Sequence, residues 1–286
     1  MRVYLYYRTY WGDNNGPGWL GRTVIAKNKL ELVDVCIKSM NLSNIEIIKY
    51  AFIDNPTSEY ENFISKHFDK IIHTAEGKDI DDIVNGWPVF GSVGSLIRLF
   101  EFMLDNQHKD NDVILLVEDD YLFAPDAINK WVKAVQSLGD FVTPFDHPDR
   151  YIRSDDLYAK KTRIQIVSNH HWRQSESCTS VIGGTFKTFR KTFFLRKIPR
   201  LYAKGLYPER IIGRELPGVD RVFCRRAHYL MGINIYSPIP GIACHLSKFV
   251  PPTTKKLIRK GVETPETQLS PGYDWDRRYK EILETT

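Results

Sequence analysis

The sequence predicts an α/β protein built on a mostly parallel central sheet flanked by helices. Strand-like and helix-like segments alternate through the first half of the chain, which is typical of parallel, doubly wound sheets. The run 113–117 is entirely apolar, as a parallel strand covered on both faces would be. Directly after it come three carboxylates, Glu118, Asp119 and Asp120, at the strand end where open α/β sheets bind their ligands.

The first half contains the clearest elements. A first strand is expected over residues 2–8, and the glycine-rich segment 12–18 after it must be a loop. Apolar residues spaced three and four positions apart predict helices, and short β-branched or aromatic runs predict strands. On these grounds helices are expected at 22–40, 58–67, 91–106 and 125–138, and further strands at 45–53, 70–73 and 113–117.

The second half is less regular. Strands are predicted at 140–144, 163–168 and 233–237, and an apolar stretch lies near 178–186. Helices are predicted near 188–204 and 219–229, and a short charged helix from about Trp275. The sequence contains no internal repeat and no clear interdomain linker. We therefore expect one domain over residues 1–250, followed by a C-terminal tail over 251–286.

Composition is that of an ordinary globular enzyme, with 42% hydrophobic and 26% charged residues in a chain of 286. The four cysteines are widely spaced and form no CxxC pair, which argues against a zinc ribbon or a disulfide framework and favours reduced thiols. They are Cys36, Cys178, Cys224 and Cys244.

Membrane and charge signals are weak. The sequence has no apolar run of about 18 residues, so no transmembrane helix is expected. The apolar start at residues 1–7 is too short for a signal peptide, which favours a cytoplasmic protein and leaves peripheral membrane association open.

The net charge of +5 is a mild excess of basic over acidic residues. It fits an anionic substrate such as a nucleotide sugar and does not require nucleic acid.

The acidic triplet is the leading functional signal. Three adjacent negative charges repel one another unless a cation or hydrogen-bond donors compensate them. A hard divalent ion would do so while also binding a phosphate, because Mg²⁺ or Mn²⁺ takes one or two protein carboxylates together with substrate phosphates. The alternative interpretation is a solvated acidic turn after a strand.

The segment that carries a resemblance is Val117-Glu-Asp-Asp-Tyr-Leu-Phe-Ala-Pro-Asp126. It is similar to the Glu-Asp-Asp segment of the N-acetylglucosaminyltransferase I group, and the layout of residues 2–250 resembles GT-A glycosyltransferases of the family 2 type. The resemblance implies a Rossmann-like fold that binds a nucleotide sugar in residues 1–124 and the acceptor in 125–250. It also implies that Asp120 holds Mn²⁺ or Mg²⁺ on the donor diphosphate, with Glu118 and Asp119 on the nucleotide side and a UDP-sugar favoured.

Other positions fit the same resemblance as nucleotide contacts. Arg8 and Thr9 follow the first strand, and Asp54 ends the second, where a carboxylate can accept hydrogen bonds from a ribose or a uracil N–H. Asp54 is equally well explained as the start of a turn. Arg98 lies in the helix after a glycine- and serine-rich start and can reach a phosphate, although ordinary N-capping also explains that start.

An inverting glycosyltransferase needs a carboxylate that accepts the proton of the attacking hydroxyl. Asp220 fits, because it follows a Pro-Gly turn at the start of a predicted helix, whose dipole favours the ionised form. Glu215 is the second candidate. The alternative is that Asp220 is a plain first-turn residue and Glu215 a surface charge.

Late in the chain, His245 follows a Pro-Gly turn, where many GT-A enzymes place a histidine near the metal, and imidazole suits Mn²⁺ better than Mg²⁺. Lys248 is expected to neutralise the leaving diphosphate. Candidate substrate contacts combine an aromatic face for stacking with hydrogen-bonding groups. They are Asp146, Trp172, Arg173, Glu176 and Ser177.

Together these signals predict a metal-dependent, inverting glycosyltransferase. A glycan, a lipid-linked sugar, a protein and modified DNA are all compatible acceptors. A nucleotidyltransferase is the first alternative. That class favours a glycine- and lysine-rich signature such as Gly-Gly-x-Gly-x-Arg, and the glycine-rich loop at 12–18 lacks a matching basic pattern. A non-catalytic carbohydrate- or nucleic-acid-binding module is the second. Oligomeric state cannot be derived from the sequence.

Overall fold

The computed structural model describes residues 1–11, 26–42, 45–54, 56–74, 83–84, 87–88, 91–147, 163–175, 178, 181–196, 219–246, 270 and 272–284. Its centre is a nine-stranded sheet with the order β3-β2-β1-β6-β11-β8-β12-β10-β9. The strands are β1 (Val3–Tyr10), β2 (Ile47–Asp54), β3 (Lys70–His73), β6 (Val113–Glu118), β8 (Phe141–Val142), β9 (Ile164–Val167), β10 (His170–Ser175), β11 (Ile182–Thr185) and β12 (Ile235–Ile239).

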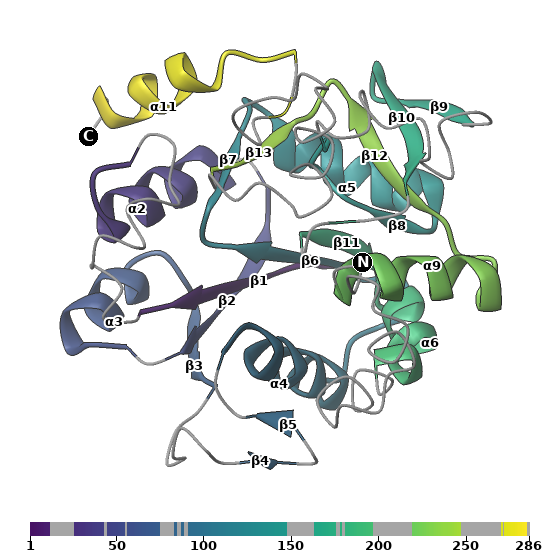
Figure 1. Ribbon diagram of the computed structural model, residues 1–286, viewed down its shortest axis with the longest axis horizontal. Helices are drawn as coiled ribbons and strands as arrows, with labels where there is room; N and C mark the ends of the chain where they lie inside the picture. Colours follow the sequence, from purple (N-terminus) through teal and green to yellow (C-terminus); the bar gives the residue numbers. More distant parts are fainter. Residues whose placement is uncertain are drawn as a thin grey trace, which may run out of the picture.

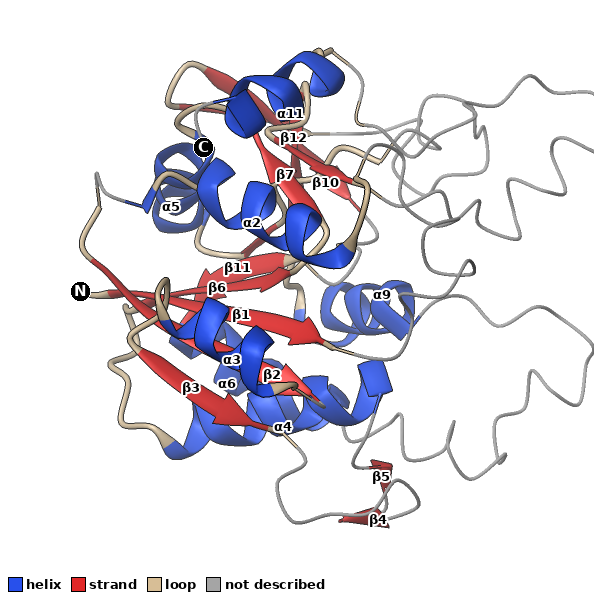
Figure 2. Cartoon of the chain, turned by 90° about the vertical axis from the view of Figure 1, so that its left-hand side faces the viewer, coloured by secondary structure: helices blue, strands red, loops and turns tan. Residues whose placement is uncertain are grey.

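All of these strands run in one direction except β10 and β11. From β3 to β6 the sheet is purely parallel, so the carboxyl ends of four neighbouring strands lie at the same edge. Figure 2 shows β1, β2 and β3 as arrows pointing the same way. The structure thus confirms the predicted α/β class and the mostly parallel central sheet.

Helices cover both faces of the sheet (Figure 1). One apolar cluster joins the sheet to α2 (Lys29–Ser39), α3 (Ser58–Ser65), α5 (Ala127–Leu138) and α11 (Trp275–Glu284). The other cluster joins the opposite face to α4 (Gly91–Asp105), α6 (Phe186–Arg196) and α9 (Val219–Met231). Because side chains alternate along a strand, Leu5 and Tyr7 belong to the first cluster and Tyr4 and Tyr6 to the second.

Two glycines allow β11 to lie close to its neighbours. A Cβ at Gly183 would lie 2.8 Å from Nε1 of Trp131, and one at Gly184 would lie 2.9 Å from the ring of Phe141. The Trp131 indole is fully buried and donates to the carbonyl of Val142 at 2.9 Å. Larger residues in the middle of β11 would therefore displace packed aromatic rings on both faces of the sheet.

Two short antiparallel pairs lie outside the main sheet. The pair β4 (Ile83–Val84) and β5 (Trp87–Pro88) follows β3 in the chain. The pair β7 (Tyr121–Phe123) and β13 (Ala243–His245) brings the end of the acidic segment beside a strand more than a hundred residues later. In this pair His245 lies directly opposite Tyr121, and the amide of Leu246 donates to the carbonyl of Asp120 at 2.8 Å.

Most sequence-based elements appear where they were expected. The strand predicted at 70–73 has the same bounds as β3. The remaining first-half strands and helices 58–67, 91–106 and 125–138 agree within a few residues. The strand expected at 233–237 lies instead at Ile235–Ile239, and β4, β5, β7, β10 and β13 were not predicted as strands. Parts of the helices expected at 22–40 and 188–204, and most of the tail after 251, fall outside the described residues.

None of the helices within the described ranges is long and apolar enough to cross a lipid bilayer. All four cysteines are buried and free. Cys178 and Cys224 approach each other to 3.6 Å between their sulfur atoms, which joins α9 to the segment before β11.

His108 provides a test of the packing at the opposite, amino-terminal edge of β6. Its Nε2 lies 2.7 Å from the hydroxyl of Tyr6, and its ring packs edge-on against Tyr4 at 4.3 Å. Burial lowers the pKa of His108 below 6.5, against the opposing effect of Asp112. The folded protein therefore binds a proton at His108 only at a lower pH than the unfolded chain does. Below about pH 6.5 the unfolded chain carries more protons at this residue than the folded protein.

We expect the free energy of unfolding to decrease as the pH falls from 6.5 through the lower pKa of the folded state, and part of this decrease to vanish in His108→Gln. Urea unfolding at a series of pH values measures it. An NMR titration of the His108 ring that gave a pKa above 6.5 in the folded protein would contradict the assignment.

Candidate active site at the acidic end of the sheet

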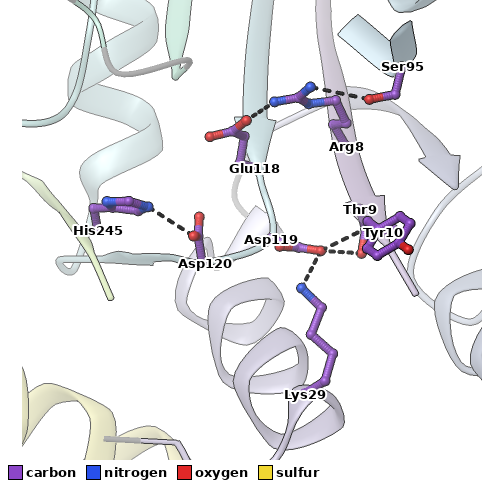
Figure 3. A network of polar contacts seen from close by, with 9 residues as sticks. All are labelled: Arg8, Thr9, Tyr10, Lys29, Ser95, Glu118, Asp119, Asp120 and His245. Atoms are coloured by element: carbon purple, nitrogen blue, oxygen red, sulfur yellow. Dashed lines mark hydrogen bonds and ion pairs between the residues drawn. The ribbon is translucent and has the colours of Figure 1, made fainter. Parts of the chain in front are cut away.

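The acidic triplet lies where strand β6 leaves the sheet. Glu118 is the last residue of β6, while Asp119 and Asp120 form the turn that leads into β7. The neighbouring parallel strand β1 ends at Tyr10, with Arg8 directly opposite Glu118 in the ladder. The carboxyl ends of both strands thus meet at one edge, and their side chains form the polar network drawn in Figure 3.

Glu118 pairs with Arg8. The guanidinium contacts Oε1 of Glu118 through Nη2 and donates through Nη1 to Oγ of Ser95 at 3.2 Å. Only 10% of the Arg8 side chain and 23% of the Glu118 side chain are exposed. Ser95 lies in α4, so the pair also ties this helix to the end of the sheet.

Asp119 is held by three donors that converge on its Oδ2. They are Nζ of Lys29 at 2.6 Å, Oγ1 of Thr9 at 2.5 Å and the backbone amide of Tyr10 at 3.2 Å. Thr9 in turn contacts the hydroxyl of the buried Tyr60. Asp119 is thereby fixed as part of the framework at the end of β1.

Lys29 was not identified from the sequence, although a local signal was present. Asn28 before it is an N-cap residue, and its side-chain oxygen accepts the amide of Glu31 at 2.9 Å. This cap fixes the start of α2, so that the first helical residue points its side chain at the acidic turn. Only the tertiary fold reveals this contact, because α2 and the triplet are about ninety residues apart in the chain.

Asp120 pairs with His245, whose Nε2 lies 2.9 Å from Oδ2. The imidazole stacks on the ring of Tyr121, with centroids 4.9 Å apart, and meets the edge of Phe145. This aromatic packing and the β7–β13 pairing hold His245 in place. The resemblance to GT-A enzymes implied that Asp120 and His245 are metal ligands, and the structure brings their side chains into contact.

The Asp120 carboxyl is the exception in the triplet. Burial opposes its ionisation, but the charge and the hydrogen bond of His245, with a smaller effect of Lys29, lower its pKa below the usual value. Its Oδ1 is buried and accepts no hydrogen bond within the described part of the chain. An ionised carboxylate with one buried, uncompensated oxygen is a suitable ligand for a cation.

The donor set fits a divalent ion that shares its coordination with phosphate. Adjacent ligands of an octahedral Mg²⁺ or Mn²⁺ lie about 3 Å apart, given metal–ligand distances near 2.1 Å. The 2.9 Å between Oδ2 of Asp120 and Nε2 of His245 is the length of their hydrogen bond, and an ion bound by both atoms would take the place of the proton between them. Among the described residues no three His, Cys, Asp or Glu side chains gather into a group that would hold a metal by themselves.

Two further nucleotide-contact candidates lie on elements that reach this edge. Asp54 ends β2, is 1% exposed, and accepts the amide of Trp11 through its backbone oxygen at 3.0 Å. Arg98 lies in α4 one turn after Ser95 and pairs with Glu101 at 3.3 Å. Both remain predictions as ligand contacts.

Of the substrate candidates, Asp146 and Arg173 form an ion pair with 2.5 Å between Oδ1 and Nη2, and Asp146 is completely buried. Trp172 is also completely buried, in the apolar cluster of α2 and α5, and its indole donates to the carbonyl of Val167 at 3.3 Å. Because no face of this ring is exposed, the expected stacking of a sugar on Trp172 is not possible in this arrangement.

The remaining candidates lie partly or wholly outside the described residues. Glu176, Ser177, Glu215 and Lys248 are not described. Asp220 lies in the first turn of α9, as expected, but only the backbone of this residue is described.

Comparison with known proteins gives distant structural similarity only. No family model matches the chain, and no curated protein sequence matches it. A Mycobacterium tuberculosis glucosyl-3-phosphoglycerate synthase in complex with Mg²⁺ and uridine diphosphate is 10% identical, with a TM-score of 0.45 over 92% of this chain and 81% of that one.

Two other solved structures show the same degree of similarity. A galactosyltransferase LgtC with donor and acceptor sugar analogs is 9% identical, with a TM-score of 0.43 over 99% of this chain and 95% of that one. A CMP:2-keto-3-deoxy-manno-octonic acid synthetase with CTP is 12% identical, with a TM-score of 0.40 over 91% and 98%. At these TM-scores the similarities carry no argument about activity.

Tyr7 lies in β1 within the core near the site, and its hydroxyl lacks a partner in the described part of the chain. The side chain is fully buried, and burial together with Asp119 raises the pKa of its hydroxyl well above 10.0. A buried hydroxyl without a partner loses its hydration without compensation.

We expect Tyr7→Phe to keep or raise the free energy of unfolding, by up to about 1 kcal/mol. The matched control is Tyr279→Phe in α11, which removes a hydrogen bond of 2.7 Å to Glu31 and should lower stability. Urea unfolding of the two variants compares them directly. A loss in Tyr7→Phe as large as in the control would mean that its hydroxyl has a partner.

Proposed function

We propose that this protein is a metal-dependent glycosyltransferase, which transfers a sugar from a nucleoside diphosphate sugar to an acceptor hydroxyl at the carboxyl edge of β1 and β6. The observation that carries the proposal is that the three carboxylates of the acidic triplet are compensated to different degrees. Glu118 and Asp119 are compensated by Arg8 and Lys29, whereas Asp120 keeps a buried oxygen that accepts no hydrogen bond from the described residues and is free to bind a cation.

In this proposal Asp120 and His245 hold Mn²⁺ or Mg²⁺, which when bound neutralises the donor diphosphate and stabilises the negative charge of the leaving group. Two protein ligands suffice, because phosphate oxygens and water complete the coordination of such ions. Arg8 and Glu118 lie beside the site as an ion pair and are the proposed contacts on the nucleotide side. A UDP-sugar is the favoured donor.

Asp220 is the proposed base. Its position in the first turn of the thirteen-residue helix α9 favours a carboxylate over a carboxylic acid. A carboxylate there would accept the proton of the acceptor hydroxyl as the hydroxyl oxygen bonds to the anomeric carbon. The bond from that carbon to the nucleoside diphosphate breaks on the opposite face, which inverts the configuration. Glu215 is the second candidate for the same role, and Lys248 and Arg98 are candidates for contacts with the leaving diphosphate.

The first test is a thermal-shift panel of UDP, GDP, ADP and CDP with and without Mn²⁺. A ligand that binds the folded state raises the apparent melting temperature by mass action. We expect one nucleotide to stabilise the protein in a metal-dependent manner, and Asp120→Asn to abolish the metal dependence. Asp126→Asn is the control, since this carboxylate lies at the start of α5 and is exposed. Metal-dependent stabilisation that persists in Asp120→Asn would contradict the proposed ligand.

The second test concerns the base. We expect Asp220→Asn to bind nucleotide and metal as the wild type does and to transfer sugar at least a hundredfold more slowly, because general-base catalysis contributes about 10²–10⁴-fold. Transfer at the normal rate would exclude Asp220. Release of pyrophosphate from a nucleoside triphosphate and a sugar phosphate would instead indicate a nucleotidyltransferase.

A further inference from the structure

Two lysines of helix α2 pair with carboxylates at the same distance but in different surroundings. Lys29 Nζ lies 2.6 Å from Asp119 in the acidic turn, and Lys38 Nζ lies 2.6 Å from Asp34 within the same helix. The Lys29 side chain is 11% exposed and the Lys38 side chain 34%. Nine residues separate them, or about 13 Å along the helix axis.

The Lys29 contact is a specific, enclosed ion pair. Asp119 is 14% exposed, and its Oδ2 accepts hydrogen bonds from Thr9 and Tyr10 in addition to the lysine. Surface pairs such as Lys38–Asp34 contribute little, but a pair from which water is largely excluded is strongly coupled. Removing Lys29 leaves Asp119 with two neutral donors and no cation, beside Asp120.

That position matters for metal chemistry, because adjacent free carboxylates can bind one ion together. An ion bound by two carboxylates and an imidazole has fewer positions left for phosphate oxygens than an ion bound by one carboxylate and an imidazole. The pairing of Asp119 with Lys29 thus determines whether one or two carboxylates coordinate the ion.

We propose that Lys29 is a positioning residue that keeps Asp119 away from the metal, so that the ion is held by Asp120 and His245 alone and binds tightly only together with a nucleoside diphosphate. The inference rests on the proposed function and deepens it. Lys29 acts through Asp119 and has no role in the transfer step itself. Figure 3 shows the three carboxylates with their separate partners, Arg8, Lys29 and His245.

A double-mutant cycle tests the inference, with Mn²⁺ alone as the probe and free Mn²⁺ measured by electron paramagnetic resonance. Lys29→Met is expected to bind Mn²⁺ about tenfold more tightly than the wild type, because Asp119 becomes available. Asp119→Asn is expected to bind it about tenfold more weakly, because the negative charge that balances Lys29 in this ion pair is then lost. The double variant should return close to the wild type.

Two controls accompany the cycle. Lys29→Arg should behave as the wild type because the charge is retained, and Lys38→Met should leave Mn²⁺ binding unchanged. In the presence of the nucleoside diphosphate, the increase of Mn²⁺ affinity that the nucleotide causes should be about tenfold smaller in Lys29→Met than in Lys38→Met. A purely structural role would instead weaken Mn²⁺ binding in both single variants.

The inference is overturned if Lys29→Met binds Mn²⁺ no more tightly than Lys38→Met, or if the double variant is as weak as Asp119→Asn, which would make Asp119 a direct ligand. Should Lys29→Met fail to fold, the comparison of Asp119→Asn with the double variant still decides between these outcomes. Failure of the wild type to bind Mn²⁺ with any nucleotide would instead remove the proposed function.

Discussion

Charge compensation at the end of β6 is the constraint on which the site depends. Three consecutive carboxylates can stand at the edge of a buried sheet only if each finds a partner, because like charges at these distances repel strongly in a medium of low dielectric constant. The fold supplies these partners from three separate elements, namely Arg8 from β1, Lys29 from α2 and His245 from β13. The three partners differ in chemistry, since they are a guanidinium, an ammonium group and an imidazole.

The same partners connect the site to distant parts of the chain. Helix α2 presents Lys29, and the C-terminal helix α11 packs against α2, with the hydroxyl of Tyr279 donating to Glu31 at 2.7 Å. Arg278 donates to the carbonyl of Phe123 at 3.2 Å, so α11 also holds β7 directly after the acidic turn. The last described helix thus contacts both α2, which presents Lys29, and β7, which follows the acidic turn.

Much of this architecture could be predicted, but not evenly. Apolar runs such as 113–117 identify buried parallel strands because such strands are covered on both faces. Short strands such as β7 and β13 have no pattern of their own, since each exists only by pairing with the other across more than a hundred residues. Trp172 illustrates a different error, in which a sequence pattern suggested a role that its burial does not support. Its polar neighbours made it resemble a sugar-binding aromatic residue, while its indole packs in the core and meets a backbone carbonyl.

For the site itself, the sequence determined which groups stand at the end of β6, because a buried strand followed at once by three carboxylates places them at the ligand-binding edge of an α/β sheet. The sequence did not determine which basic side chain pairs with each carboxylate. Lys29 is one lysine among many in the sequence, and only the fold directs it to Asp119 instead of to water. The pairing of ions depends on distances of a few ångströms between segments far apart in the chain, and such distances are a property of the tertiary structure alone.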